Sequence, residues 1–254
     1  MKSMIGLWSS ASLSVAAIAI TGVVHTAAAN EEVEWDEAEL FFELNNTDGD
    51  LGIHANIDGG PWKKLDIEDP RGKRILKIKA SGRLGRQGMT QLEWESAEPT
   101  FDELSPTQFF RRFPEGVYEI EGETLEGEEL ESEVEISHVM AAPVGNVTVN
   151  SQFAAASCDA DVLPVVSLPV AIDWDPVTES HPDIGTPGVP VAISRYQLFV
   201  ERDDVKFSVD LDSETTEFPI PDAFLSDSGV WKYEIIARTE DGNNTAIESC
   251  FFLL

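Results

Sequence analysis

Residues 51–58 of this sequence read LGIHANID, and residues 129–136 read ELESEVEI. In the first stretch Leu51, Ile53 and Ile57 alternate with polar or small residues, and in the second every other residue is a glutamate. A period of two places successive side chains on opposite faces of an extended chain. Each stretch therefore predicts a β-strand that has one buried face and one solvated face.

The rest of the N-terminal half repeats this pattern in short segments. Similar apolar runs occur at residues 40–42, 65–67, 76–80, 92–94 and 118–120. Turn-forming sequences separate the runs, at residues 48–49, 58–61, 69–72 and 126–127. About seven strands at this spacing predict an antiparallel β-sandwich.

One helix is expected to interrupt these strands. The sequence Ser105-Pro106-Thr107-Gln108 has the form of a capping box, with Ser105 as N-cap and Pro106 in the first helical position. Phenylalanines follow at positions 109, 110 and 113, so the helix has an apolar side, and Pro114 marks its end. The helix is predicted to cover one end of the sheet.

The N-terminus has the composition of an export signal. Lys2 supplies a positive charge, residues 11–24 are mostly apolar, and alanines at positions 27–29 fit a cleavage site. The apolar run is shorter than the roughly 20 residues that span a bilayer. We therefore expect residues 1–29 to be removed, and the mature protein to be secreted or periplasmic, with no membrane span. The signal and the excess of acidic residues favour a bacterial source.

The charge and the apolar content of the sequence exclude a nucleic-acid partner and a disordered chain. The chain has 47 acidic and 17 basic residues, a formal charge of −30, which becomes −31 once Lys2 is removed. Such a charge repels phosphate backbones, so nucleic-acid binding is not expected. Apolar residues make up 42 % of the sequence, which is typical of a globular protein rather than an acidic disordered tail.

The mature chain is predicted to contain two all-β domains. Residues 30–143 form the N-terminal sandwich, residues 144–164 a linker or a loosely held strand, and residues 165–254 a second sandwich. The composition of the linker, rich in alanine, serine, valine and asparagine, marks the boundary.

The second half resembles a fibronectin type III domain over about 90 residues. The segment 172–176, IDWDP, resembles the second strand with its core tryptophan, and 194–200, SRYQLFV, the third strand with its core tyrosine. Leu225, Trp231 and Ala237 are spaced like the loop and sixth strand, and residues 241–244 and 246–253 like the final hairpin and last strand.

Trp231 stands where the family usually has the tyrosine of a corner, so an indole N–H or packing would have to replace the hydroxyl bond. The resemblance implies a binding or spacer module and not a catalyst. The N-terminal half only weakly resembles bacterial immunoglobulin-like modules.

Cys158 and Cys250 are the only cysteines. An even pair in an exported chain favours a disulfide, here between the linker and the last strand. Two buried free thiols are the alternative. A catalytic thiol is not expected, because neither cysteine has an adjacent basic residue that would lower its pKa.

One loop suggests a metal ion. Asn46, Asp48 and Asp50 have the i, i+2, i+4 spacing that opens calcium loops, and Asp58 would complete the site if the next turn lay beside it. Leu51 occupies the position usually held by glycine, and Asp48-Gly49 is equally typical of a plain hairpin turn. The histidines His54, His138 and His181 lack the mutual spacing of zinc ligands, so no zinc site is expected.

The sequence thus favours an exported, non-enzymatic binding or structural module whose protein or glycan partner it does not identify. A calcium-stabilised adhesive or carbohydrate-binding protein is the first alternative, with Trp62 and Trp94 as residues that could stack on sugar, although parity favours a core position for Trp94. A polysaccharide hydrolase that uses acidic pairs such as Glu93 and Glu95 is the second. No catalytic residue is assigned.

Overall fold

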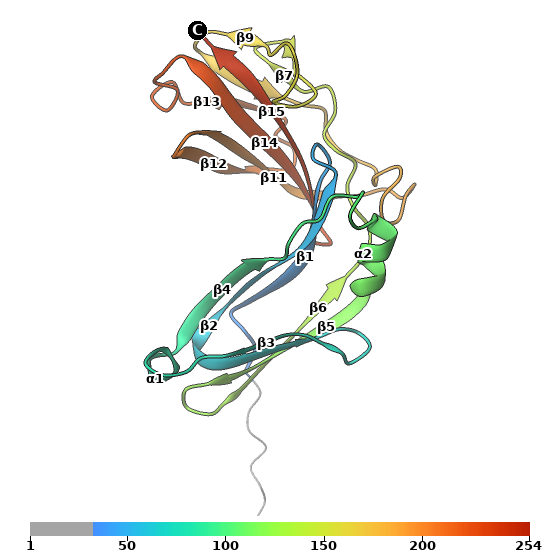
Figure 1. Cartoon of the computed structure of the whole chain (residues 1–254), viewed down its shortest axis with the longest axis vertical. Coiled ribbons are helices and arrows are strands. Elements are labelled where there is room, and N and C mark those ends of the chain that lie inside the picture. Colours follow the sequence, from blue (N-terminus) through green and yellow to red (C-terminus); the bar gives the residue numbers. More distant parts are fainter. Residues whose placement is uncertain (1–32) are drawn as a thin grey trace, which may run out of the picture. The chain divides into compact units, whose positions relative to one another are not determined.

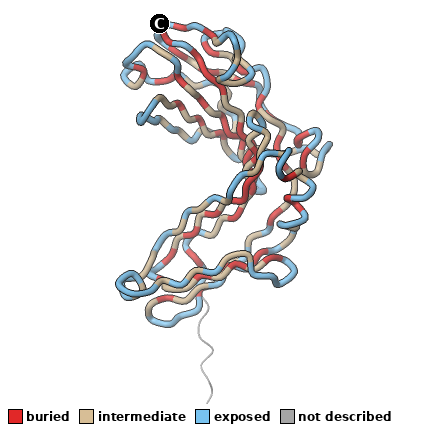
Figure 2. Tube along the Cα trace, viewed as in Figure 1, coloured by how far each residue is buried: buried red, intermediate tan, exposed pale blue. Residues whose placement is uncertain are grey.

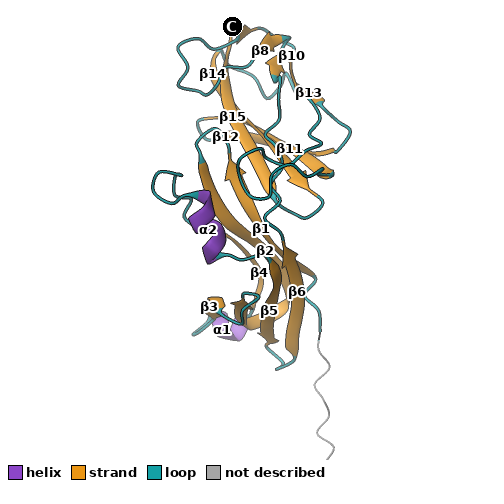
Figure 3. Cartoon of the chain, turned by 90° about the vertical axis from the view of Figure 1, so that its right-hand side faces the viewer, coloured by secondary structure: helices purple, strands orange, loops and turns teal. Residues whose placement is uncertain are grey.

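The computed structural model describes residues 33–254, and the predicted signal peptide at residues 1–29 lies outside them. The chain from residue 31 to residue 254 forms one compact unit. Figure 3 shows strands throughout the described part and two short helices. The strands are β1 Glu37–Asn45, β2 Asp50–Glu68, β3 Arg74–Lys79, β4 Met89–Glu95, β5 Gly116–Thr124, β6 Glu129–Ile136, β7 Thr148–Val149, β8 Gln152–Phe153, β9 Val165–Val166, β10 Val170–Asp173, β11 Ile193–Arg202, β12 Val205–Asp212, β13 Glu217–Ile220, β14 Gly229–Thr239 and β15 Asn244–Leu253, and the helices are α1 Leu84–Gln87 and α2 Pro106–Arg112. The predicted all-β class is confirmed.

Two hydrophobic clusters lie within this unit. One gathers buried side chains between Trp35 and Met140 together with Ile184, and the other gathers buried side chains between Ala141 and Leu253. We call the corresponding residues, 33–140 and 141–254, the N-terminal and C-terminal lobes. Buried residues alternate with partly exposed ones along strands such as β1 and β11, as the period of two predicted (Figure 2). The division of the chain at residues 143–165 stays a prediction.

The long strand β2 belongs to both layers of the N-terminal lobe. Its first half pairs with β1 and β4, and its second half pairs with β3 and β5. The turn predicted at residues 58–61 is wrong, because the strand continues through it with a shift of register between Asp58 and Trp62. Gly59 allows this bend, since a Cβ there would lie 3.0 Å from the ring of Trp35. Six strands therefore replace the seven expected.

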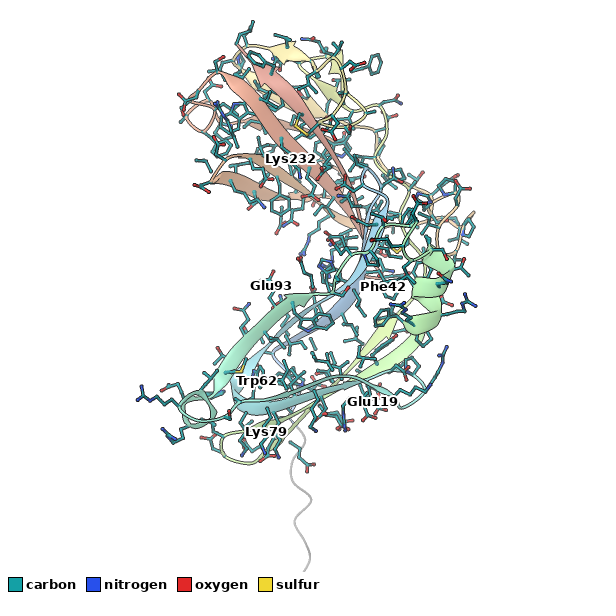
Figure 4. The ribbon with its side chains drawn as sticks, in the orientation of Figure 1. Phe42, Trp62, Lys79, Glu93, Glu119 and Lys232 are labelled. Atoms are coloured by element: carbon teal, nitrogen blue, oxygen red, sulfur yellow. A yellow bond between two sulfur atoms is a disulfide. The ribbon has the colours of Figure 1, made fainter. Side chains whose placement is uncertain are left out.

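Helix α2 covers one end of this core. Phe109 and Phe110 are buried, and both of their rings lie 5.5 Å from the ring of Phe42, which is labelled in Figure 4. Full burial of such a side chain contributes about 1.5–3 kcal/mol. The helix is placed as predicted, but the side chain of Ser105 makes no capping bond. Its main-chain carbonyl instead accepts hydrogen bonds from the N–H groups of residues 108 and 109.

The C-terminal lobe contains two sheets. One has the order β12-β11-β14-β15, and the other has the order β13-β10-β7-β8. Trp174 and Tyr196 are buried between them, with ring centroids 5.5 Å apart, and the Tyr196 hydroxyl accepts a hydrogen bond from the Val177 N–H. Strands β11, β14 and β15 therefore lie where the fibronectin type III resemblance predicted strands, whereas β10 ends at Asp173, one residue before Trp174.

In each lobe, an aromatic side chain of one strand donates a hydrogen bond to the main-chain carbonyl four residues before it. In the C-terminal lobe the indole N–H of Trp231 donates to the main-chain carbonyl of Asp227 at 3.1 Å. In the N-terminal lobe the hydroxyl of Tyr118 donates to the carbonyl of Pro114 at 3.0 Å. Trp231 therefore replaces the expected tyrosine bond with an indole bond, one of the two arrangements that the sequence left open.

A disulfide joins Cys158 to Cys250, 92 residues apart, so the linker is attached to β15 as the sequence predicted. Beside it, the Ser249 hydroxyl donates to the carbonyl of Ala155 at 2.9 Å. The linker is therefore held along the last strand by a covalent bond and a hydrogen bond.

The two lobes share one sheet, because β1 and β15 pair in parallel through residues 43–45 and 244–246. Figure 1 shows these strands, coloured blue and red, meeting side by side. Asn243, only 1 % exposed, fastens the junction: its Oδ1 accepts the Phe42 N–H, and its Nδ2 donates to the carbonyls of Ser137 and Val139. Three main-chain groups that would otherwise be unpaired are thereby satisfied.

Candidate functional site

The predicted calcium loop lies in the turn between β1 and β2. Asn45 organises the turn, since its Oδ1 accepts the N–H groups of Thr47 and Asp48. Gly49 has a φ of +69°, a conformation that glycine adopts readily. Asn46 does not face a shared centre: its Oδ1 lies 3.0 Å from Nε2 of His181, in the other lobe.

The four predicted ligands are not brought together. Asp50 begins β2 opposite Asn45, whereas Asp58 pairs with Glu37 at the far end of β1. Eight residues of extended strand separate the two aspartates, a distance of about 26 Å at about 3.3 Å per residue. Asp58 therefore cannot complete a site with Asn46, Asp48 and Asp50.

The outward side chains of the shared sheet form a different feature. Alternate residues of β12, β11, β14, β15, β1, β2 and β4 point away from both hydrophobic clusters, and we call this surface the shared outer face. It lines a cavity of about 690 Å³. Charged side chains of both signs surround the cavity: Glu39, Glu43, His54, Glu93, Glu95, Arg195, Lys206, Glu234 and Arg238.

Arg238 crosses between the lobes on this face. Its Nη2 lies 2.9 Å from Oε1 of Glu39, and its guanidinium carbon lies 4.7 Å from the centroid of the Phe41 ring. Its side chain is only 12 % exposed. An ion pair and a cation–π contact thus reinforce the main-chain pairing of β1 with β15.

Three donor side chains converge beside this contact. One ligand atom from each of Glu43, His54 and Glu98 lies within 4.8 Å of the others. Nε2 of His54 is 2.9 Å from Oε1 of Glu98, and the two side chains are 13 % and 31 % exposed. The ring of His54 stacks on Phe41 at 5.4 Å, which fixes its orientation.

The backbone of β2 makes room for Glu98. Gly52 lies directly opposite Glu43 on the neighbouring strand, two residues before His54. A Cβ on Gly52 would lie 2.4 Å from Oε1 of Glu98 and 2.8 Å from its Cγ. The Glu98 carboxylate therefore occupies the space that a side chain at position 52 would fill.

The pKa values around the cluster reflect burial and crowded carboxylates. Burial, followed by the charges of Glu98 and Asp48, raises the pKa of Asp50 to about 6. Burial and then Glu43 raise the pKa of Glu234 to about 7. Burial lowers the pKa of His54, but the hydrogen bond that its ring donates to Glu98 and the charge of Glu43 outweigh it, so that pKa lies above its ordinary value.

Sequence reasoning did not find this cluster. The strand pattern predicts His54 on the face opposite the core, where its side chain is only 13 % exposed, and the histidines were compared only with zinc-ligand spacing. The alternation of side chains along β1 and β2 could have indicated part of it, because it places Glu43 and His54 on one face of the sheet. The glycine at position 52 lies on that same face.

The tryptophans proposed for sugar stacking belong to the core. Trp62 is fully buried, so that part of the carbohydrate hypothesis is wrong. Trp94 is partly buried and packs against the N-terminal hydrophobic cluster, as its parity indicated. Within residues 33–254, no helix is long and apolar enough to cross a membrane.

Comparison with known proteins gives structural likeness alone. No protein-family model matches the sequence, and no curated protein matches it either. A segment of two fibronectin type III domains from chicken tenascin is similar over 85 % of this chain and 97 % of its own, at 12 % identity and a TM-score of 0.27.

Bacterial adhesins also occur among the similar structures. One concerns host cell surface retention of a 1.5-MDa bacterial ice-binding adhesin, with 10 % identity, a TM-score of 0.25 and coverage of 87 % of this chain and 65 % of the other. Another is a tandem repeat from the extending region of a large adhesion protein, with 12 % identity, a TM-score of 0.26 and coverage of 86 % and 50 %. The chain therefore spans less than two thirds of either adhesin chain.

Proposed function

We propose that the protein is an exported, non-enzymatic binding or structural module of the envelope or extracellular space. The observation that carries this proposal is the junction between the lobes. A parallel strand pair, the buried Asn243 and the Arg238–Glu39 ion pair join two sandwiches into one sheet. Such a junction keeps the two lobes in a fixed arrangement, as a spacer or a two-part binding surface requires.

The shared outer face is the proposed contact surface. Arg195, which is half-buried, and Lys206, which is exposed, line its cavity among several carboxylates. Mixed charges on a preorganised surface favour specific contact with a polar partner, because the side chains lose little freedom on binding. The disulfide between the linker and β15 supports an oxidising, extracytoplasmic compartment.

The test uses the mature chain, residues 30–254, immobilised and exposed to solubilised envelope and to defined polysaccharides. A double variant, Arg195→Glu with Lys206→Glu, reverses two charges on the shared outer face. Its matched control is Lys77→Glu with Lys79→Glu on β3, outside the cavity. We expect the first variant, and not the control, to lose the retained component.

Two results would contradict the proposal. Equal retention by both double variants would show that the shared outer face is not the contact surface. Release of reducing ends from a polysaccharide, abolished by Glu93→Gln or Glu95→Gln, would instead identify a hydrolase.

A further inference from the structure

We propose that Glu43, His54 and Glu98 form a binding site for one divalent transition-metal ion of the zinc class, at the junction of the two lobes. This inference goes beyond the proposed function, since it does not depend on which partner the module binds. The three ligand atoms come from β1, from β2 and from the segment after β4, and all lie within 4.8 Å of one another.

The donor set selects the class of ion. An imidazole nitrogen with carboxylate oxygens suits zinc and its neighbours, whereas calcium prefers oxygen ligands alone. Bonds of about 2.0–2.2 Å in tetrahedral geometry place donor atoms about 3.4 Å apart. The His54–Glu98 pair, at 2.9 Å, is already close to that separation, and the widest pair would have to close by about 1.4 Å. Rotation of the two glutamate side chains is sufficient for such changes.

Gly52 gives the site its shape. Because position 52 has no side chain, the Glu98 carboxylate can approach between Glu43 and His54 instead of pointing into solvent. A structural ion pair between His54 and Glu98 would not by itself require Glu43 to face the same point. The convergence of all three groups on the space above Gly52 is what a bound cation would explain.

Asn244 provides a second, independent observation. It begins β15 in the C-terminal lobe, is only 6 % exposed and lines the same cavity as Glu43 and His54. Its Nδ2 donates to Oε2 of Glu43 at 2.8 Å, while its Oδ1 has no hydrogen-bond partner among the described residues. A buried amide oxygen without a partner is unfavourable, because it has lost the water that solvated it in the unfolded chain. A water molecule bound to the metal could donate to this oxygen and so satisfy it.

The hydrogen bond from Asn244 also orients one ligand from the opposite lobe. Outer contacts of this kind hold ligating carboxylates in position. An ion at this point would therefore link the N-terminal lobe, which supplies the ligands, to the C-terminal lobe, which supplies the orienting amide.

The experiment is a zinc titration of the metal-stripped mature protein at pH 7.5, by calorimetry and by thermal melting, with a tag that contains no histidine. We expect one zinc ion per chain and a rise in melting temperature, because an ion that binds only the folded state raises its stability. Glu98→Gln and Gly52→Ala should each weaken zinc binding at least tenfold. Glu93→Gln, an exposed acid in the same cavity, is the matched control and should leave binding unchanged.

Melting in chelator shows whether each variant is folded. His138→Gln reports on zinc held by a histidine outside the cluster and should bind like the unmodified chain. The proposal is overturned if the unmodified chain binds no zinc at millimolar concentration, or if Glu98→Gln and His54→Gln bind as the control does. It is also overturned if calcium raises the melting temperature and zinc does not, which would favour the oxygen ligands of the turn at residues 46–50. None of these readouts involves a macromolecular partner, so a failure here is distinct from a failure of the proposed function.

Discussion

Glu234 should make the protein less stable as the pH rises from about 4.5 to about 7. This residue lies on β14 between Phe199 of β11 and Glu248 of β15. Burial and the charge of Glu43 raise its pKa from 4.5 to about 7, although Lys232 and Lys206 act in the opposite direction. Between these two values the folded protein holds a proton that the unfolded chain has released.

The sign of the effect follows from that proton. Because the folded state binds more protons in this interval, the free energy of unfolding falls as pH rises from about 4.5 to about 7. The difference between the two pKa values, at about 1.36 kcal/mol per pH unit, amounts to about 3 kcal/mol. Glu234→Gln removes the ionisation while keeping the shape of the side chain, so the variant should gain up to about 3 kcal/mol over the unmodified chain at pH 8 and little at pH 4.

Urea denaturation at intervals from pH 4 to pH 8 measures this difference. Glu217→Gln, which removes the same charge from an exposed position on the other sheet, is the control and should show no such pH-dependent gain. If the advantage of Glu234→Gln were constant across the range, or if the control gained as much, burial of the Glu234 carboxylate would not be the cause.

Three further substitutions test the junction and the C-terminal lobe. Replacing Cys158 and Cys250 by alanine opens a loop of 92 residues and should cost about 4–5 kcal/mol in the chain-entropy model, measured as a shift of the denaturation midpoint. Asn243→Ala leaves three main-chain groups without partners and should cost about 3 kcal/mol, with weaker hydrogen-exchange protection at Phe42. Trp231→Phe removes the indole bond to Asp227 and should cost about 1 kcal/mol or more, and an unchanged melting curve would show that packing alone holds that corner.

Local patterns in the sequence predicted most of the strands and the longer helix. The period of two in residues 51–57 and 129–136 predicted strands correctly, because burial on one face acts on each strand separately. Helix α2 and the disulfide followed from composition and spacing. The continuation of β2 through Gly59 could not be predicted, since Gly-Gly-Pro is equally compatible with a turn and with a bulged strand, and the contact of Gly59 with the ring of Trp35 is not visible in the local sequence.

Contacts between distant parts of the chain could not be predicted from local patterns in the sequence. Glu43 pairs with Asn244 across about two hundred residues, and neither residue belongs to a motif that indicates this partner. The candidate metal site has the same property, because Glu43, His54 and Glu98 have no characteristic spacing and converge only through strand register. The calcium hypothesis relied on local spacing, and strand geometry places Asp58 at the wrong end of β2.

The parallel pairing of β1 with β15 bears on how this protein can be dissected. A recombinant fragment that starts after residue 143 would contain β15 without its neighbour and would expose the edge at residues 244–246. Unpaired strand edges recruit other chains, so such a fragment should tend to self-associate even though it keeps its own hydrophobic cluster except for Ala141. Fragments meant for separate study would need a replacement strand, such as a short peptide with the sequence of residues 41–46, to cap that edge.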